Sequence, residues 1–224
     1  YVLDCYHGRT RPLDNLFDYA LYILLFPQLI AGPIVRFNEV AEQLPAEKRR
    51  LSHDVLLEGL LRFLIGLSKK VLLANALGEV VDAAFELPAG ELGMVSSWVV
   101  IVAYAFQIYF DFSGYSDMAI GSARLLGVRF PENFRWPYAA VSPKDFWGRW
   151  HISLSSWIRD YLYLPLTGQA FRTSSRGGLE EASDAEASDL RRDRALVLTW
   201  FIMGLWHGAQ WTFALWGLFH AFWV

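Results

Sequence analysis

Apolar residues gather in four long runs, and charged segments separate these runs from one another. A helix needs roughly 20 mostly apolar residues to cross a membrane, and each run is at least about that long. The pattern therefore predicts an all-α, multi-pass membrane protein, with apolar helical segments at residues 16–35, 55–77, 94–126 and 195–224. We expect the whole chain, residues 1–224, to form a single membrane domain.

Pro27, Gly32 and Pro33 interrupt the first run. Broken backbone inside lipid is stable only where protein or a water-filled cavity satisfies its polar groups. This run is therefore expected to form either a kinked helix or a re-entrant segment that lines a cavity.

The second run carries charges that a lipid-facing helix would not tolerate. Glu58 and Arg62 stand four residues apart, which favours an ion pair within one helix. Lys69 and Lys70 follow in the second half of the run. We expect an interfacial or cavity-facing helix whose lysines extend toward water.

The third run begins with the simplest spanning segment, residues 94–113. Asp111 and Asp117 then flank Ser113 and Gly114. This arrangement predicts either a break between two helices that is lined by polar groups, or helix capping at the interface, because Asp and Ser both favour N-cap positions.

The fourth run is longer than one span needs, so it forms either one long tilted helix or two segments that meet around Gly208. Gly204 and Gly208 make a pair of small residues four apart, which permits close helix packing. On a continuous helix, one face would carry Trp200, Gly204, His207, Gly208 and Trp211.

Residues 145–166 are rich in tryptophan and are predicted to form a helix at headgroup level, with His151, Ser155 and Arg159 on one face. The mixed-charge segment 168–194 is expected to be a flexible, water-exposed loop, and the next helix is expected to begin at about Leu190. Non-helical or loop segments are also expected at residues 1–15, 36–54, 78–93 and 127–144.

Composition supports the membrane assignment and excludes other classes. Hydrophobic residues make up 54% of the chain, and its ten tryptophans fit aromatic belts at two interfaces. No basic stripe interleaved with aromatics is present, so we expect no nucleic-acid partner. Cys5 is the single cysteine, which rules out a disulfide within the chain. No zinc-protease, P-loop, G-x-S-x-G or dinucleotide pattern occurs, so we predict no metal and no bound cofactor.

His207 is the one ionisable residue in the Trp-rich apolar run 198–211. A lone buried histidine is more often a hydrogen-bonded structural residue than a catalytic one. Here, however, the same apolar chain also contains His151, Asp111 and Asp117. Several polar groups that are costly to bury suggest a shared internal site.

At these residues the sequence resembles the membrane-bound O-acyltransferase family, and most closely its bacterial branch of alginate O-acetyltransferases and teichoic-acid D-alanylation proteins. The resemblance covers nearly the whole chain. It is carried by the motifs FPQLIAGPI (26–34), GLSKKV (66–71), QIYFDFSGYSD (107–117), FWGRWHISLS (146–155), RDYLYLPL (159–166) and GLWHGA (204–209).

The resemblance implies a bundle of membrane helices around a tunnel, with re-entrant and interfacial helices, in a bacterial inner membrane. The family's near-invariant histidine matches His207, and its second functional histidine matches His151. The donor would be acyl-CoA or another acyl thioester on the cytoplasmic side. The acceptor would be a hydroxyl of an exported polysaccharide, and a separate periplasmic acetyltransferase would be a partner.

From these residues we expect His207 to act as general base on the acceptor hydroxyl and His151 to orient or polarise the acyl group or the acceptor. An anionic donor or polysaccharide would be attracted by Arg149 or Arg159. The expected substrate-binding residues are Trp150, Ser155, Arg149, Asp111, Trp206 and Trp211.

The chain departs from the family pattern in one internal segment and at its two ends. The family usually has a short loop where this chain has the charged insert 168–194. Because the chain starts at Tyr1 and ends at Val224 inside an apolar run, we expect it to be a piece of a longer protein.

Three other functions remain open at this point. The first is D-alanyl transfer in teichoic-acid modification. The second is a transporter or channel, because broken helices and intramembrane acids and histidines also build ion pathways. The third is a non-catalytic scaffold for an export machine.

Overall fold

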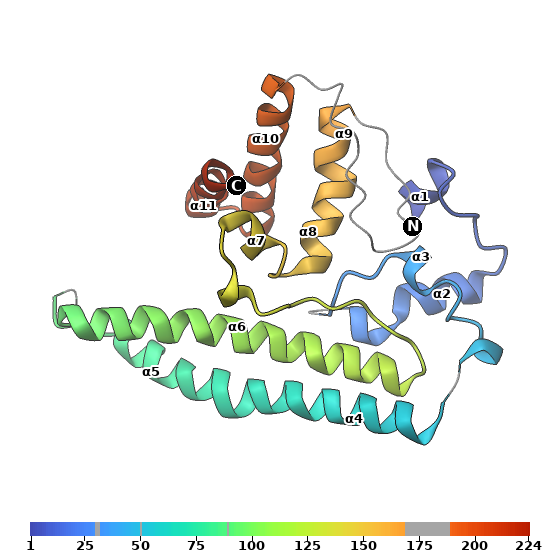
Figure 1. The fold of residues 1–224 in the computed structure, drawn as a ribbon, viewed down its shortest axis with the longest axis horizontal. Helices are drawn as coiled ribbons and strands as arrows, with labels where there is room; N and C mark the ends of the chain where they lie inside the picture. Colours follow the sequence, from blue (N-terminus) through green and yellow to red (C-terminus); the bar gives the residue numbers. More distant parts are fainter. Residues whose placement is uncertain (30–31, 50, 89, 169–188) are drawn as a thin grey trace. The chain divides into compact units, whose positions relative to one another are not determined.

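The computed structural model describes residues 1–224 except 30–31, 50, 89 and 169–188 (Figure 1). The described residues form helices joined by turns and loops, with no β-strand among them. The chain divides into two compact units. The first contains Tyr1–Pro12 and Phe134–Val224, and the second contains Leu13–Asn133. A single membrane domain over residues 1–224 stays a prediction.

The second unit is built on a helical hairpin. Helix α4 (His53–Ser68) continues through the π-helical turn η3 (Lys69–Ala74) into α5 (Asn75–Phe85), and this run packs along α6 (Met94–Leu125) (Figure 1). The Ser52 hydroxyl accepts a hydrogen bond from the Val55 amide and so caps the start of α4.

Glycines let the two arms of this hairpin approach closely. A Cβ atom on Gly66 would lie 2.5 Å from the Gly114 carbonyl oxygen, and one on Gly121 would lie 2.7 Å from the Gly59 carbonyl oxygen. Both distances are too short for a real side chain, so the backbones touch where the glycines face each other.

Helix α6 is continuous through Ser113 and Gly114, so both the expected helix break and the expected caps at this point are wrong. The acids that suggested a break are neutralised by the neighbouring arm instead. Asp117 pairs with Arg62 at 2.7 Å and with Lys69 at 2.6 Å, and Asp111 pairs with Lys70. A buried carboxylate with two cationic partners needs no helix end to stabilise it.

The ion pair expected between Glu58 and Arg62 is also replaced by contacts with α6 and the segment after it. Glu58 pairs with Arg124 at 2.6 Å, and Arg62 pairs with Asp117 and with Glu132. Lys69 and Lys70 likewise pair with acids rather than extend to water. Helix α5 reaches Phe85, so the first half of the loop expected at residues 78–93 is helical.

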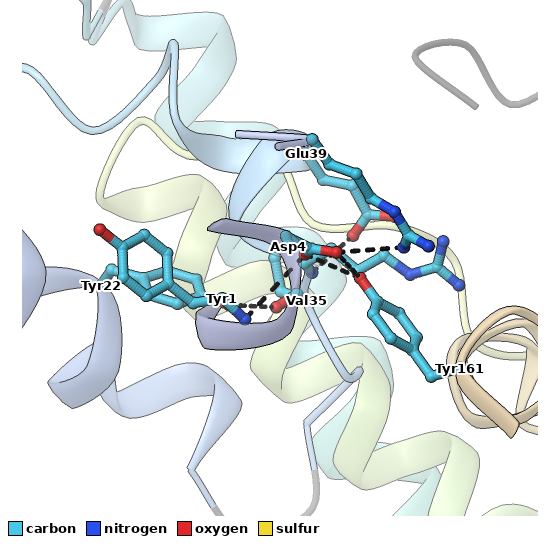
Figure 2. A network of polar contacts seen from close by, with 8 residues as sticks. Tyr1, Asp4, Tyr22, Val35, Glu39 and Tyr161 are labelled. Carbon is cyan, nitrogen blue, oxygen red and sulfur yellow. Dashed lines mark hydrogen bonds and ion pairs between the residues drawn. The ribbon is translucent and has the colours of Figure 1, made fainter. Parts of the chain in front are cut away.

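The first apolar run is broken as expected. Helix α2 (Leu16–Leu24) stops before the 3-10 turn η1 (Phe26–Gln28), and the Tyr22 hydroxyl donates to the Val35 carbonyl oxygen at 3.0 Å (Figure 2). The short turns α3 (Phe37–Val40) and η2 (Ala46–Lys48) follow. Pro27, the second residue of η1, fixes the end of α2 because its ring cannot continue the preceding helix.

By length and apolar composition, α6 is the one helix among the described residues that could cross a membrane. It is 32 residues long, which exceeds the roughly 20 residues that a spanning helix needs.

In the first unit, residues 2–6 form α1 (Val2–Tyr6) rather than the expected loop. Buried Asp4 explains this, because its carboxylate accepts hydrogen bonds from the Tyr161 hydroxyl at 2.7 Å and pairs with Arg9 at 3.2 Å (Figure 2). The helix is thus stabilised by a tertiary contact that spans more than 150 residues of sequence, which local patterning does not reveal.

Residues 137–167 of this unit form short segments instead of one long helix. These are η4 (Pro137–Ala139), α7 (Pro143–Trp147), α8 (Ile152–Ile158), the π-helical turn η5 (Arg159–Tyr163) and α9 (Leu164–Thr167). The irregular segment 127–136 agrees with the absence of helical period there.

The fourth apolar run forms two helices, α10 (Asp189–His207) and α11 (Trp211–Trp223), which meet at Gly208 (Figure 1). This confirms the two-segment alternative and the helix start near Leu190. A Cβ atom on Gly204 would collide with the Phe213 carbonyl oxygen, so the small residue serves the packing of α10 on α11. Most of the loop predicted at 168–194 lies outside the described residues.

Candidate active site

His207 is the last residue of α10, and its side chain is exposed in this chain. Its Nδ1 atom lies 2.7 Å from the carbonyl oxygen of Met203, one turn earlier on the helix. A carbonyl oxygen only accepts hydrogen bonds, so this contact requires the proton on Nδ1. The Nε2 atom then carries the lone pair that a general base uses.

Two tryptophan rings flank the His207 imidazole. The ring centres of Trp206 and Trp216 lie 5.0 and 5.1 Å from that of His207, both in edge-to-face geometry. Trp206 is 63% exposed, whereas Trp216 is half-buried. Because α10 ends at His207, Gly208 and Trp211 do not continue its face, and the expected shared five-residue face is wrong at those two positions.

His151 precedes α8 in a left-handed backbone conformation, with φ at +44°. Its side chain is 9% exposed, and its ring stacks on that of Phe134 with centres 6.5 Å apart. Burial, together with the charge of His207, lowers the pKa of His151 to about 4. The unit that contains His207 thus also contains His151, which burial keeps neutral at physiological pH.

The expected helical face with His151, Ser155 and Arg159 does not form. A helix cannot run through the left-handed conformation at His151, and the π-helical turn η5 further changes the register at Arg159. Ser155 nevertheless stays close to the histidine, because its backbone amide donates to the His151 carbonyl oxygen at 3.0 Å. The Ser155 hydroxyl donates to the Trp150 carbonyl oxygen at 3.3 Å.

The two candidate arginines are paired with carboxylates. Arg149 donates from Nε to Asp145 at 2.7 Å, which holds the pKa of that carboxyl below its usual value. Arg159 donates from Nε to its neighbour Asp160 at 2.8 Å. Asp111 belongs to the other compact unit, where it pairs with Lys70. Within one unit, the structure thus collects the predicted site residues except Asp111.

Two residues of this region, Trp216 and His220, were not among those expected from the sequence. Both lie on α11, four residues apart, and their ring centres are 4.7 Å from each other. The rings of Trp147 and Trp200 complete a four-ring cluster with them. The other five pairs of ring centres in this cluster are separated by 4.9 to 6.4 Å. The i, i+4 spacing of Trp216 and His220 was the available signal.

Two surface cavities lie elsewhere among the described residues, and neither is lined by His151 or His207. One surface cavity of about 550 Å³ lies in the second unit, beside residues such as Lys48, Arg124 and Arg129. Another of about 460 Å³ lies between α10 and α11, beside Val197 and Leu218. Among the described residues, no three His, Cys, Asp or Glu side chains are arranged to hold a metal ion.

Comparison with known proteins agrees with the motifs. The chain is 43% identical over 224 residues to a probable alginate O-acetylase of Azotobacter vinelandii, covering all of this chain and 41% of the relative. It is 41% identical over 209 residues to a peptidoglycan O-acetyltransferase of Helicobacter pylori, covering 93% of this chain and 36% of the relative. It is 29% identical over 222 residues to a teichoic acid D-alanyltransferase of Bacillus subtilis, covering 98% of this chain and 53% of the relative.

The chain thus spans about two fifths of the length of the O-acetylating relatives. The similarity to the Azotobacter protein extends over the full chain. Residues 11–179 match the model of the membrane-bound O-acyltransferase family. On these matches, the chain belongs to the membrane-bound O-acyltransferase family.

Proposed function

We propose that the protein transfers an acetyl group from a cytoplasmic thioester, such as acetyl-CoA, toward hydroxyls of an exported polysaccharide. The observation that carries this proposal is the imidazole of His207, whose Nδ1 is committed to a backbone carbonyl, in the same unit as buried, neutral His151. The similarity to alginate and peptidoglycan O-acetylating proteins supports acetyl as the acyl group and a glycan as the acceptor.

In this mechanism, His207 removes the proton from the acceptor hydroxyl. Nε2 takes the proton while the hydroxyl oxygen attacks the thioester carbonyl carbon, which forms the new C–O bond. The C–S bond then breaks, and the thiolate leaves and regains a proton. General-base assistance of this kind typically contributes about 10²–10⁴-fold.

A hydrogen bond holds the ring of His207 during this step. The Nδ1–H group donates to the Met203 carbonyl oxygen whether or not Nε2 carries a proton.

His151 would serve the oxygen of the thioester carbonyl. Negative charge develops on that oxygen as the hydroxyl attacks, and an N–H donor aimed at it stabilises the transition state. A neutral imidazole is able to donate in this way without competing with His207 for the proton. The low pKa of His151, about 4, keeps it in that form.

The remaining predicted residues would bind the substrates around this pair. We assign the hydroxyl of Ser155 and the rings of Trp150, Trp206 and Trp211 to the acyl and acceptor groups, and Arg149 to an anionic donor. The tunnel, the multi-pass arrangement in the inner membrane and the periplasmic acetyltransferase partner belong to this same proposal.

D-alanyl transfer is the second candidate, and the 29% identity to a teichoic acid D-alanyltransferase favours it. The higher identity to alginate O-acetylases places it second. Family membership favours acyl transfer over transport, for which no specific feature of the structure argues.

Labelled acyl transfer by the full-length protein in membrane vesicles tests the proposal. Vesicles would receive [¹⁴C]acetyl-CoA or a D-alanyl thioester, together with polysaccharide and the periplasmic fraction, and ester-linked label would be counted. We expect acetyl ester with the wild type and with His53→Gln, an exposed control, and none with His207→Gln. Normal ester formation by both His207→Gln and His207→Ala would remove His207 from catalysis, and label uptake without ester would indicate transport.

A further inference from the structure

The four-ring cluster defined by Trp147, Trp200, Trp216 and His220 joins three helices of the first unit. Trp147 comes from α7, Trp200 from α10, and the other two rings from α11. Trp200 is 7% exposed, and each of its partners is half-buried. Aromatic pairs in edge-to-face or offset geometry contribute about 0.5–1.5 kcal/mol each beyond simple burial. The four-ring cluster therefore packs the three helices rigidly together.

Trp216 belongs to the four-ring cluster and also contacts His207. One side of its indole faces His220 at 4.7 Å, and the ring also lies 5.1 Å from the His207 imidazole. The other ring near His207, Trp206, is its sequence neighbour and largely exposed. Trp216 is therefore the contact that ties the candidate base to the buried part of the unit.

The connection is needed because α10 ends at His207. Beyond that residue, Gly208 to Gln210 form a short non-helical link, so no further helical turn supports the imidazole. The hydrogen bond to Met203 restrains the Nδ1 atom of His207. The imidazole ring can still rotate about the line from Nδ1 to the carbonyl oxygen. A flat ring packed against the imidazole removes this remaining freedom.

Trp147 connects the four-ring cluster to the segment that carries the second histidine. It contacts Trp200, Trp216 and His220, and it ends α7, only four residues before His151. The same cluster thus reaches the segment that carries His151 and the helix end that carries His207.

We propose that Trp216 is a positioning residue, which the four-ring cluster holds in place and which in turn fixes the imidazole of His207 for proton transfer. This inference rests on the proposed role of His207 as the base. In this inference, His220 acts as a packing ring and takes no part in the proton transfer. Positioning is valuable because small misplacements of a reacting group cost large factors in rate.

The test compares Trp216→Ala, Trp216→Phe and the control Trp223→Ala in the full-length protein. Trp223 lies on the same helix, and its ring contacts only the neighbouring rings of Phe219 and Phe222 among the described residues. We expect Trp216→Ala to lower kcat by about 10- to 100-fold with little change in KM for the thioester. Trp216→Phe should restore most of the rate, and Trp223→Ala should leave it unchanged.

A spectroscopic measurement separates positioning from general damage to the fold. In ¹⁵N spectra of histidine-labelled protein, the His207 signals should report one protonated Nδ1 in the wild type and in Trp223→Ala. Trp216→Ala should mix the two tautomers at temperatures well below its own melting temperature, whereas Trp216→Phe should keep one tautomer. His220→Phe, which keeps a ring, should retain the wild-type kcat.

The outcomes distinguish this inference from the proposed function. If His207→Gln retains activity, the base assignment fails and the role of Trp216 falls with it. If His207→Gln is inactive while Trp216→Ala keeps its kcat and its single tautomer, only the positioning role is overturned. Loss of activity in His220→Phe would overturn the packing role of His220.

Discussion

The Nδ1 atom of His207 and the carbonyl oxygen of Met203 are 2.7 Å apart at the C-terminal end of α10. A backbone acceptor of the same helix thus fixes the tautomer of the candidate base. It needs no second side chain, and it leaves the Nε2 lone pair for the proton transfer that we propose.

The first prediction concerns that tautomer. ¹⁵N spectra of the resting protein at pH 8 should show His207 protonated at Nδ1 and unprotonated at Nε2, because the carbonyl of Met203 accepts only from an N–H. The signals would be assigned by their loss in His207→Gln. A proton found on Nε2 would contradict the hydrogen bond and the assignment of that atom as base.

The second prediction concerns the pH dependence of stability, which His151 should dominate at mildly acid pH. Its pKa falls from the ordinary 6.5 to about 4 in the folded protein. The unfolded chain therefore binds a proton between pH 6.5 and 4 that the folded chain does not, so stability falls as the pH falls through this window. The loss at pH 4 should be about 3 kcal/mol for this group alone.

Melting temperatures of the wild type and of His151→Gln, measured at pH 7.5, 6 and 5, check this. The wild type should lose stability more steeply toward pH 5 than the variant, which has no imidazole at that position. Equal slopes for the two proteins would show that His151 titrates normally when folded.

The third prediction concerns the carboxylate of Asp117, which is buried against two cations on the neighbouring arm. Asp117→Asn leaves Lys69 without its partner and Arg62 with Glu132 alone. Breaking a buried pair from one side costs about 3–5 kcal/mol, and the partial exposure of both cations puts this site at the low end.

The matched control is Glu58→Gln, because its pair with Arg124 includes a carboxylate that is largely exposed. That change should cost about 0–1 kcal/mol. Thermal unfolding of the full-length variants compares the two. A drop for Asp117→Asn no larger than that for Glu58→Gln would show that the buried pairs contribute little.

The fourth prediction concerns the close approach of α10 and α11. A Cβ atom on Gly217 would collide with the carbonyl oxygen of Trp200 and press on Gly204. Gly217→Ala should therefore push the helices apart, lower the melting temperature, and reduce kcat by displacing Trp216. Gly93→Ala, where a Cβ would meet nothing within 4 Å, should change neither quantity, and equal behaviour of the two variants would contradict the packing.

Tertiary contacts account for the differences between expected and observed elements. The acids at positions 111 and 117 resemble helix ends in the sequence, but lysines and an arginine on the opposite arm neutralise them, and α6 runs through unbroken. The segment around His151 has helical spacing, yet its backbone turns left-handed there. Partners that are distant in the sequence decide both cases, and no local pattern contains them.

By itself, the sequence determined the all-helical fold, the broken first run, the division of the last run near Gly208, and the family to which the chain belongs. These features follow from periodicity, proline and glycine positions, and motifs, all of which act over a few residues. Only the tertiary structure decided that His151 is buried in the same unit as His207, that the Met203 carbonyl sets the tautomer of His207, and that the rings of Trp216 and His220 pack beside this histidine or its neighbours. Those relationships depend on which helix faces pack together, and packing is settled by the free energy of the whole fold rather than by any one segment.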